Sequence, residues 1–261
     1  MLSYPNINPT ILNIGPLQLQ WYGLMYIIGI IAGTQFCKKY LLKLGFKSEE
    51  VYDLVSYIVL GMLLGGRIGY VLFYNLSFYI SNPLKIIAIW EGGMSYHGGA
   101  IGCALAIIWA SKKYKKNVLS LLDLMGIGST FGLFFGRIGN FINGELYGRP
   151  TNSWVGMIFP NGGNIPRHPS QLYESFLEGF VLFWILFFVL RYFKLNPGYL
   201  FCLYVGFYGL FRFIIEYFRE PDTHLGFIIG KLSMGQCLSS IMILFALSLS
   251  HYLYHYYYPK K

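Results

Sequence analysis

Charged residues are scarce in this chain, and that scarcity is the first constraint on its fold. Asp, Glu, Lys and Arg make up 12% of its 261 residues, whereas a soluble domain carries about 25%. Hydrophobic residues make up 55%, and several near-continuous apolar runs have the length of a membrane-spanning helix, about 20 residues. The composition therefore argues against a soluble domain and predicts a polytopic membrane protein.

Cysteine frameworks and common catalytic motifs are also missing. The four cysteines stand apart in apolar runs without CxxC or histidine spacing, which argues against disulfides and a metal site. They are Cys37, Cys103, Cys202 and Cys237. The chain has no P-loop, HExxH, DxD-like cluster or GxSxG motif, so nucleotide, zinc and serine-hydrolase chemistry lack support. We expect neither a metal nor a cofactor.

The apolar runs predict an all-α protein with seven membrane-spanning helices. The predicted spans are about 17–37, 51–74, 94–111, 119–139, 172–192, 197–217 and 234–255. The N-terminus has no basic region or small-residue cleavage site of a signal peptide, so the first run is expected to be retained. No long polar linker divides the chain, and we expect one integral-membrane domain over residues 1–261.

Basic residues predict the orientation of these spans. The loops after spans one, three and five, with the C-terminus, are rich in Lys and Arg, whereas the opposite loops hold few. The rich side has Lys38, Lys39, Lys43, Lys47, Lys112, Lys113, Lys115, Lys116, Arg191, Lys194, Lys260 and Lys261, and the poor side has Lys85, Arg149, Arg167, Arg219 and Lys231. This bias predicts an external N-terminus and a cytoplasmic C-terminus. It also explains the net charge of +9 without nucleic acid.

The stretch GRIGNFINGELYG (136–148) ends the fourth span and holds Arg137, Asn140 and Glu145. Ionisable groups at membrane depth cost about 2.5–3.5 kcal/mol each, so they are functional candidates. A snorkelling arginine at a helix end is the structural alternative, but it leaves Asn140 and Glu145 unexplained. Gly-Arg-Ile-Gly also occurs at 66–69, and a glycine ladder precedes each copy, which predicts close helix packing.

Two further groups of polar residues lie in or beside apolar runs. The sixth span carries Tyr208, Arg212, Glu216 and Arg219 on one helix face. Arg212 and Glu216 could simply neutralise each other, as an i,i+4 pair. His97 opens the third span between glycines, where it could accept a proton or be a hydrogen-bonded interface residue.

The predicted orientation brings these groups to the external leaflet. Arg67, Arg137 and Arg212 fall in the outer halves of their spans, and Tyr22 and His97 fall near outer ends. Arginine is suited to bidentate phosphate contacts, so an anionic lipid headgroup is the expected ligand. A transporter or flippase could also line a cavity with such residues, although it should place polar groups in both halves of the membrane, and Asp123 lies near an inner end. A lipid-binding scaffold without turnover is a third possibility.

The stretch GRIGNFINGELYGRP (136–150) closely resembles the signature of bacterial prolipoprotein diacylglyceryl transferases. Other blocks resemble that family in the same order: WYGLMY (21–26), GGRIGYVLFYN (65–75), WEGGMSYHGG (90–99), RHPSQLYE (167–174), YGLFRFIIEYFREPD (208–222) and SMGQ (233–236). The resemblance implies a seven-helix enzyme of the bacterial inner membrane. Such an enzyme moves diacylglyceryl from phosphatidylglycerol to the lipobox cysteine of a preprolipoprotein signal peptide and releases glycerol 1-phosphate. Segment 149–165 is shorter than in many members, which puts its peptide contacts in doubt.

The resemblance also implies roles for single residues. Arg137 matches the phosphatidylglycerol-binding arginine, Arg212 an essential arginine and His97 a histidine important for activity. We expect His97, Arg212, Tyr208, Glu145 and Asn140 to act in catalysis. The lipid-binding set is Arg137, Arg212, Tyr22, Arg67, Gly148, Glu216 and Arg219. The implied step is attack by the substrate thiolate on the glycerol carbon that bears the phosphate ester. Either His97 or Arg212 could activate that thiol.

Overall fold

A computed structural model describes residues 1–258 except 6, 15–16, 221–226 and 230–231. Pro221, Asp222, Lys231, Lys260 and Lys261, which the sequence arguments used, therefore lie outside the described residues. The chain forms two compact units. One unit comprises residues 1–36 and 123–261, and the other comprises residues 37–122. Each unit is described by itself, and the single domain over residues 1–261 stays a prediction.

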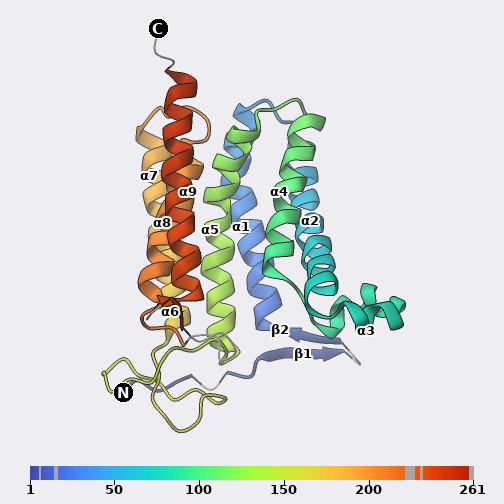
Figure 1. The fold of residues 1–261 in the computed structure, drawn as a ribbon. Helices are drawn as coiled ribbons and strands as arrows, with labels where there is room; N and C mark the ends of the chain where they lie inside the picture. Colours follow the sequence, from blue (N-terminus) through green and yellow to red (C-terminus); the bar gives the residue numbers. More distant parts are fainter. Residues whose placement is uncertain (6, 15–16, 221–226, 230–231, 259–261) are drawn as a thin grey trace. The chain divides into compact units, whose positions relative to one another are not determined.

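The larger unit contains most of the helices. Its elements are β1 (Thr10–Ile14), β2 (Leu17–Gln20), most of α1 (Trp21–Lys43) and of α5 (Val118–Ile142), α6 (Ser170–Glu174), the π-helix η3 (Ser175–Val181), α7 (Leu182–Tyr192), α8 (Tyr199–Ile215), β3 (Phe227–Ile229), β4 (Leu232–Ser233) and α9 (Met234–Tyr257). The strands make two antiparallel pairs, β1 with β2 and β3 with β4. α8 packs against α9 and against α7 (Figure 1).

The smaller unit is built on a helix pair. Its elements are α2 (Ser48–Tyr74), α3 (Leu76–Ser81), the 3-10 helices η1 (Pro83–Ile87) and η2 (Ile89–Glu91), and α4 (Tyr96–Lys113). α2 and α4 run side by side (Figure 1). Gly61 and Gly65 lie so close to the α4 backbone that a Cβ on either would clash with Gly102 or Gly98. The predicted role of this glycine ladder in close helix packing is confirmed.

The second glycine ladder, Gly128 to Gly136, does the same between α5 and α1 in the larger unit. A Cβ on Gly33 would lie 2.6 Å from the Gly128 carbonyl oxygen, and one on Gly29 would lie 3.0 Å from Gly132 Cα. A Cβ on Gly136 would meet the Tyr26 ring at 3.0 Å. Such close approach puts the two backbones in van der Waals contact. This packing stabilises helix association in a membrane, because lipid tails are as apolar as the helix surfaces and provide no hydrophobic driving force.

Seven helical segments coincide with the seven predicted spans, with end shifts of a few residues. The largest shifts are at span one, which begins at Trp21 because residues 17–20 form β2, and which ends at Lys43 and not at about residue 37. Within the described residues, four segments are long and apolar enough to cross a membrane: Ser48–Tyr74, Val118–Ile142, Ser170–Tyr192 and Met234–Tyr257. The mostly helical, membrane-type architecture is confirmed, whereas the count of seven spans and the orientation stay predictions.

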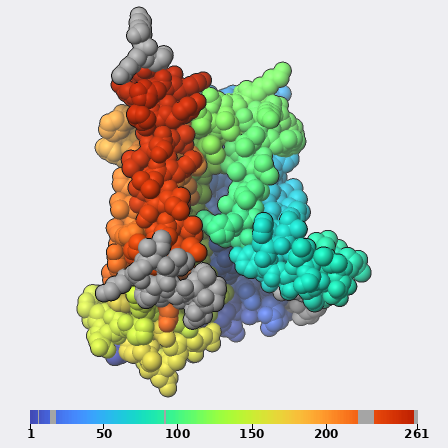
Figure 2. All heavy atoms as spheres, in the orientation of Figure 1, coloured from blue at the N-terminus to red at the C-terminus, as the bar shows by residue number. Residues whose placement is uncertain are grey.

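The surface of α9 illustrates this membrane character. Figure 2 shows α9 exposed along its length on one face of the molecule. The exposed large side chains there are mostly apolar, among them Ile241, Leu244, Phe245 and Leu247. A soluble protein rarely exposes such a continuous apolar face. In a membrane protein, this face of α9 would contact lipid tails.

Candidate functional site

The stretch that ends α5 folds back on itself and brings its polar groups together. Gly144 adopts a left-handed conformation with φ +66°, which ends the helix and turns the chain. The backbone N–H of Glu145 then donates to the Asn140 carbonyl at 3.1 Å. Asn140 Nδ2 donates to Glu145 Oε1 at 2.9 Å, and Arg137 Nη1 donates to Asn140 Oδ1 at 3.3 Å. The expected grouping of these three residues is present.

Glu174, at the end of α6, joins this group to α8. Its Oε2 lies 2.8 Å from Arg137 Nε and 2.8 Å from Arg212 Nη1. One carboxylate oxygen therefore bridges the guanidinium groups of two arginines that lie 75 positions apart in the sequence, on α5 and α8. Glu174 is completely buried, and burial of a carboxylate is costly, so these two cationic partners offset part of that cost.

Arg212 is the most heavily paired cation of this site. Besides Glu174, it lies 3.0 Å from Glu216 Oε1 and 3.6 Å from Glu178 Oε1. Glu178 is fully buried, on the π-helix η3. The i,i+4 pair with Glu216 expected from spacing is thus present, but it is one of three contacts. We call Arg137, Arg212, Arg219, Glu174, Glu178 and Glu216 the arginine–glutamate cluster.

The start of α9 closes the cluster. Glu216 lies 3.7 Å from Arg219 and accepts a hydrogen bond from Ser233 Oγ at 2.7 Å. Ser233 also caps α9 through a capping box with Gln236. A Cβ at Gly235 would clash with the Glu216 carboxylate. The SMGQ block therefore has two structural roles: it caps α9, and it holds the Glu216 carboxylate in place.

Exposure divides the cluster into two layers. The side chains of Arg137, Arg212 and Arg219 are 20%, 13% and 17% exposed, whereas Glu174 and Glu178 are 0% and Glu216 is 5% exposed. The carboxylates are therefore buried, whereas the guanidinium groups are partly exposed. Although the cluster holds three charges of each sign, its accessible side is cationic, which suits a phosphate.

Gly148 belongs to a loop platform beside this cluster. Its N–H donates to the His168 carbonyl at 2.8 Å, and the next N–H, of Arg149, donates to the Phe218 carbonyl at 2.8 Å. A Cβ on Gly148 would clash with the Phe218 carbonyl oxygen, so only glycine fits this close backbone approach. Gly148 therefore acts through its backbone, which allows the neighbouring loop segments to approach closely. Burial lowers the pKa of the nearby His168 imidazole below its ordinary value.

Two predicted tyrosines also lie in the larger unit. Tyr22 contacts Tyr26, hydroxyl to hydroxyl, at 3.4 Å, and its Cα would lie 3.0 Å from a Cβ on Gly139. Tyr208 stacks with Tyr204 one turn away on α8 and lies in the neighbourhood of Arg137 and Arg212. The structure thus places Tyr22 beside the Gly-Arg-Ile-Gly segment and Tyr208 at the arginine–glutamate cluster.

Arg67 and His97 belong to the smaller unit. Arg67 is buried, and its guanidinium donates to the backbone carbonyls of Lys85, Ile86, Gly92 and Gly93. His97 is exposed in the first turn of α4, with its ring against Tyr96. Ser95 caps that turn and donates its backbone N–H to the Gly66 carbonyl at 2.8 Å. Arg67 thus anchors the segment that leads to His97.

The sequence reasoning missed Glu174 and Glu178 as members of the site. Glu174 is the last residue of the block RHPSQLYE (167–174), and Glu178 follows it by four positions. A signal was available, because two carboxylates spaced i,i+4 at the start of an apolar run need cationic partners at membrane depth. Asp123 has an ordinary explanation: it accepts the N–H groups of Gly198 and Phe201 and caps α8.

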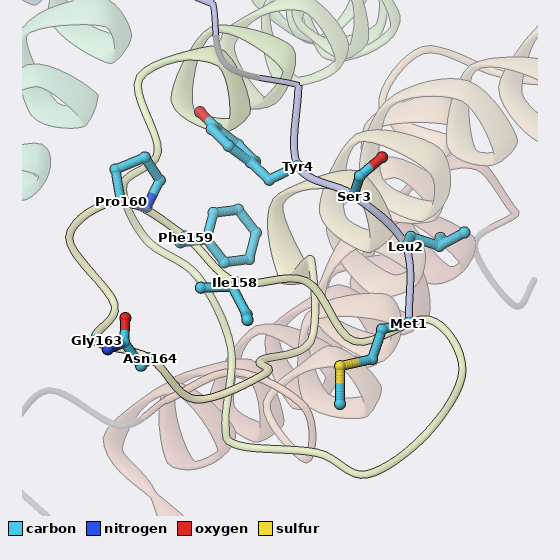
Figure 3. A pocket seen from close by; sticks show the side chains of 9 residues that line it. All are labelled: Met1, Leu2, Ser3, Tyr4, Ile158, Phe159, Pro160, Gly163 and Asn164. Atoms are coloured by element: carbon cyan, nitrogen blue, oxygen red, sulfur yellow. The ribbon is translucent and has the colours of Figure 1, made fainter.

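A second candidate is a cavity of about 470 Å³ between the N-terminal residues and the loop 158–164 (Figure 3). Figure 3 shows Tyr4 and Phe159 side by side at its wall. Its lining is Met1, Leu2, Ser3, Tyr4, Ile158, Phe159, Pro160, Gly163 and Asn164. This lining has no charged side chain, so the arginine–glutamate cluster is the better candidate for an anionic ligand.

Comparison with known proteins identifies the family of the chain. A family model described as prolipoprotein diacylglyceryl transferase matches residues 9–252. A protein of Geobacter sulfurreducens is 48% identical over 252 residues, which cover 95% of this chain and 96% of that protein. Proteins of Rickettsia felis and Rickettsia conorii are 50% and 51% identical over 253 residues, 93% of this chain and 95% of each. All three are named phosphatidylglycerol–prolipoprotein diacylglyceryl transferase.

Proposed function

Since this chain belongs to the prolipoprotein diacylglyceryl transferase family, we propose that it transfers the diacylglyceryl group of phosphatidylglycerol to prolipoproteins, the first step of lipoprotein maturation. The observation that carries the proposal beyond the family is the arginine–glutamate cluster. Two of its partly exposed guanidinium groups lie near helix ends, Arg137 on the membrane-length helix α5 and Arg212 on the shorter apolar helix α8. A lipid phosphate is the anion most available at that position.

The reaction that we propose joins a sulfur to a carbon. The lipobox cysteine of the prolipoprotein loses its thiol proton, and the thiolate attacks the diacylglycerol carbon that bears the phosphate ester. The carbon–oxygen bond breaks, a thioether forms, and glycerol 1-phosphate leaves with the bonding electrons. A free thiol has a pKa of about 8.5, so a base or a positive field must raise the thiolate fraction.

We assign the roles as follows. Arg137 and Arg212 hold the phosphate and stabilise the charge of the departing glycerol phosphate. Asn140 and Glu145 orient Arg137 and the headgroup hydroxyls, which their hydrogen bonds support. Tyr22, Tyr208, Glu216, Arg219 and Gly148 complete the headgroup surroundings. His97 is our first choice for the thiol's proton acceptor, and Arg212 is the alternative activator through its field.

Arg67 is the member of the lipid-binding set that the contacts support least. Its guanidinium already donates to four backbone carbonyls. Of its five N–H groups, these four bonds leave one, on Nη2, for a headgroup.

The topology belongs to the same proposal. Seven spans would form one domain in the bacterial inner membrane, with the N-terminus and the site on the external side. That side suits a polypeptide that emerges from secretion and a headgroup of the outer leaflet. The bias of basic residues supports this orientation, and the role of Asp123 as a helix cap removes one argument for a transport path.

The deciding experiment is an assay with the purified chain, phosphatidylglycerol and a short lipobox peptide, followed by mass spectrometry. The peptide should gain one diacylglyceryl unit, with release of glycerol phosphate. A peptide with Cys→Ser is the matched control and should gain nothing. Binding of phosphatidylglycerol without any transfer by folded protein would instead favour a scaffold or transporter.

The four cysteines of the chain offer a second control. Because the nucleophile comes from the substrate, replacing Cys37, Cys103, Cys202 and Cys237 together should leave transfer largely intact. Loss of turnover in a well-folded variant would contradict the proposed chemistry.

A further inference from the structure

Glu174 occupies the position between two arginines that an anionic ligand would need. Its Oε2 contacts Arg137 and Arg212 at 2.8 Å each. Its other oxygen, Oε1, lacks a hydrogen-bond partner among the described residues although it is buried. A buried acceptor without a donor is unfavourable. The carboxylate is therefore held by its charge but is incompletely satisfied.

A phosphate would satisfy the same arginines better. It offers several oxygens to two guanidinium groups, and arginine forms bidentate bonds with phosphate. A phosphate and the Glu174 carboxylate would repel each other if both stayed between these cations, since like charges at contact are strongly unfavourable in a medium of low dielectric. One anion must therefore give way to the other.

The remaining members of the cluster can keep the arginines in place during that exchange. Arg212 retains Glu216 at 3.0 Å and Glu178 at 3.6 Å. Arg137 retains Asn140 at 3.3 Å. Both carboxylate oxygens of Glu178 lack a hydrogen-bond partner among the described residues, so this group has unused capacity to accept from Arg212.

The backbone around Glu174 is anchored, which confines the exchange to a side chain. Ser175 Oγ donates to the Phe134 carbonyl on α5 at 2.9 Å, and a Cβ on Gly179 would lie 2.6 Å from the Phe134 Cβ. Glu174 immediately precedes the π-helix η3, and π-helical segments are frequent at functional sites. The anchor holds the carboxyl group at the arginines without fixing its final orientation.

We propose that Glu174 is a resident anion that competes with the lipid phosphate for Arg137 and Arg212 and thereby speeds release of glycerol phosphate. This inference rests on the proposed function and adds a positioning residue to it. Glu174 acts through the two arginines: it holds them in register when the site is empty, and it returns to them when the product leaves.

The test compares Glu174→Gln with the charge-matched control Glu220→Gln, a carboxylate that pairs with Arg167 and is not a member of the cluster. Calorimetry with inorganic phosphate and with glycerol 1-phosphate should show about tenfold tighter binding for Glu174→Gln, because the competing charge is gone, and little tightening for Glu220→Gln. Steady-state transfer should fall while the first turnover is kept, since product release becomes limiting. Glu174→Asp keeps the charge and should restore weak binding of both anions.

The outcomes separate this inference from the proposed function. If the wild-type chain transfers diacylglyceryl but Glu174→Gln binds phosphate more weakly, Glu174 is only structural and the inference is overturned. Equal tightening in both variants would also overturn it, since net charge would then explain the effect. If Glu174→Gln binds phosphate more tightly but the wild-type chain transfers nothing, the competition between anions is supported, whereas the proposed function and the role in product release fail.

A measurement on the wild-type chain covers the case in which the variants do not fold. Addition of inorganic phosphate, or of phosphatidylglycerol in nanodiscs, should change the infrared carboxylate band as Glu174 leaves the arginines. A phosphate response without a nanodisc response would indicate a site for free phosphate and overturn the competition with lipid. An unchanged band with both ligands bound would overturn the inference as a whole.

Discussion

The two copies of Gly-Arg-Ile-Gly have the same four residues and different surroundings. In the copy at 66–69, the hydrogen bonds of the Arg67 guanidinium to the described residues all go to backbone carbonyls, those of residues 85, 86, 92 and 93. In the copy at 136–139, Arg137 pairs with the Glu174 carboxylate and the Asn140 side chain. Both arginines follow a glycine-lined helix face, so the difference lies in their partners.

The partners decide what each arginine can do. Carbonyls on a folded backbone cannot move away without unfolding the segment, so Arg67 is fixed and serves as an anchor. Carboxylate and amide groups sit on rotatable side chains, so Arg137 can change partners. A cation whose partners can move is able to bind an anionic ligand, whereas one with four of its five N–H groups bonded to the backbone mainly stabilises the fold. A repeated motif is therefore no guarantee of a repeated function.

Replacing Arg137 should give the largest effect on activity. Arg137→Ala removes a phosphate contact and leaves Glu174 with one cationic partner fewer. Loss of one preorganised donor lowers kcat by about 10²–10³, and lipid binding should weaken as well. Turnover in the peptide assay, with binding of phosphatidylglycerol to nanodisc-embedded protein, checks both effects. Arg137→Lys should recover only part of the activity, because an ammonium lacks the planar fork. Near-normal turnover of folded Arg137→Ala would refute the site assignment.

His97→Gln should have the second-largest effect on activity. It tests the chemistry at the segment that Arg67 anchors. A general base contributes about 10²-fold or more, so turnover should fall by about that factor while phosphatidylglycerol binding changes little. The check is the ratio of turnover to binding at several pH values, since glutamine cannot titrate. If turnover is retained and its pH profile is unchanged, Arg212 becomes the preferred activator of the thiol.

These predictions also mark how far the sequence could be read. The helices and the close packing at both glycine ladders followed from apolar length and residue size, which are local properties. The grouping of Arg137 with Asn140 and Glu145, and of Arg212 with Glu216, followed from short spacings along one helix end or face.

The longer-range partners could not be read in this way. Glu174 reaches Arg137 and Arg212 only because three helical elements pack together, and no spacing in one segment encodes that. The carbonyl partners of Arg67 are backbone atoms, which every residue has. The π-helix η3 was missed for a similar reason, since its sequence has the same apolar pattern as an α-helix.

Arg67→Ala should act mainly on stability. It removes the donor of four part-buried hydrogen bonds, and a hydrogen bond that involves a charged group contributes about 1.5–3 kcal/mol. We therefore expect a clear fall in the temperature at which the purified protein loses its folded form, followed by size-exclusion chromatography after heating. Activity should fall as well, because these carbonyls belong to the segment that leads to His97. Lipid affinity of the surviving folded fraction should change little, and a loss as large as that of Arg137→Ala would make Arg67 a ligand-binding residue.

The first glycine of each motif gives the smallest and most closely matched test. A Cβ on Gly136 would meet the Tyr26 ring at 3.0 Å, and that ring is held by packing on Tyr22. A Cβ on Gly66 would meet the terminal methyl of Met94 at 2.8 Å, a flexible group that can move aside. Gly136→Ala should therefore destabilise by about 1–3 kcal/mol through overpacking, and Gly66→Ala by less. Thermal denaturation of the two variants under identical conditions checks the order. The reverse order would mean that α1 and α5 can adjust more easily than Met94, and the contrast between a rigid and an exchangeable Gly-Arg-Ile-Gly environment would then need revision.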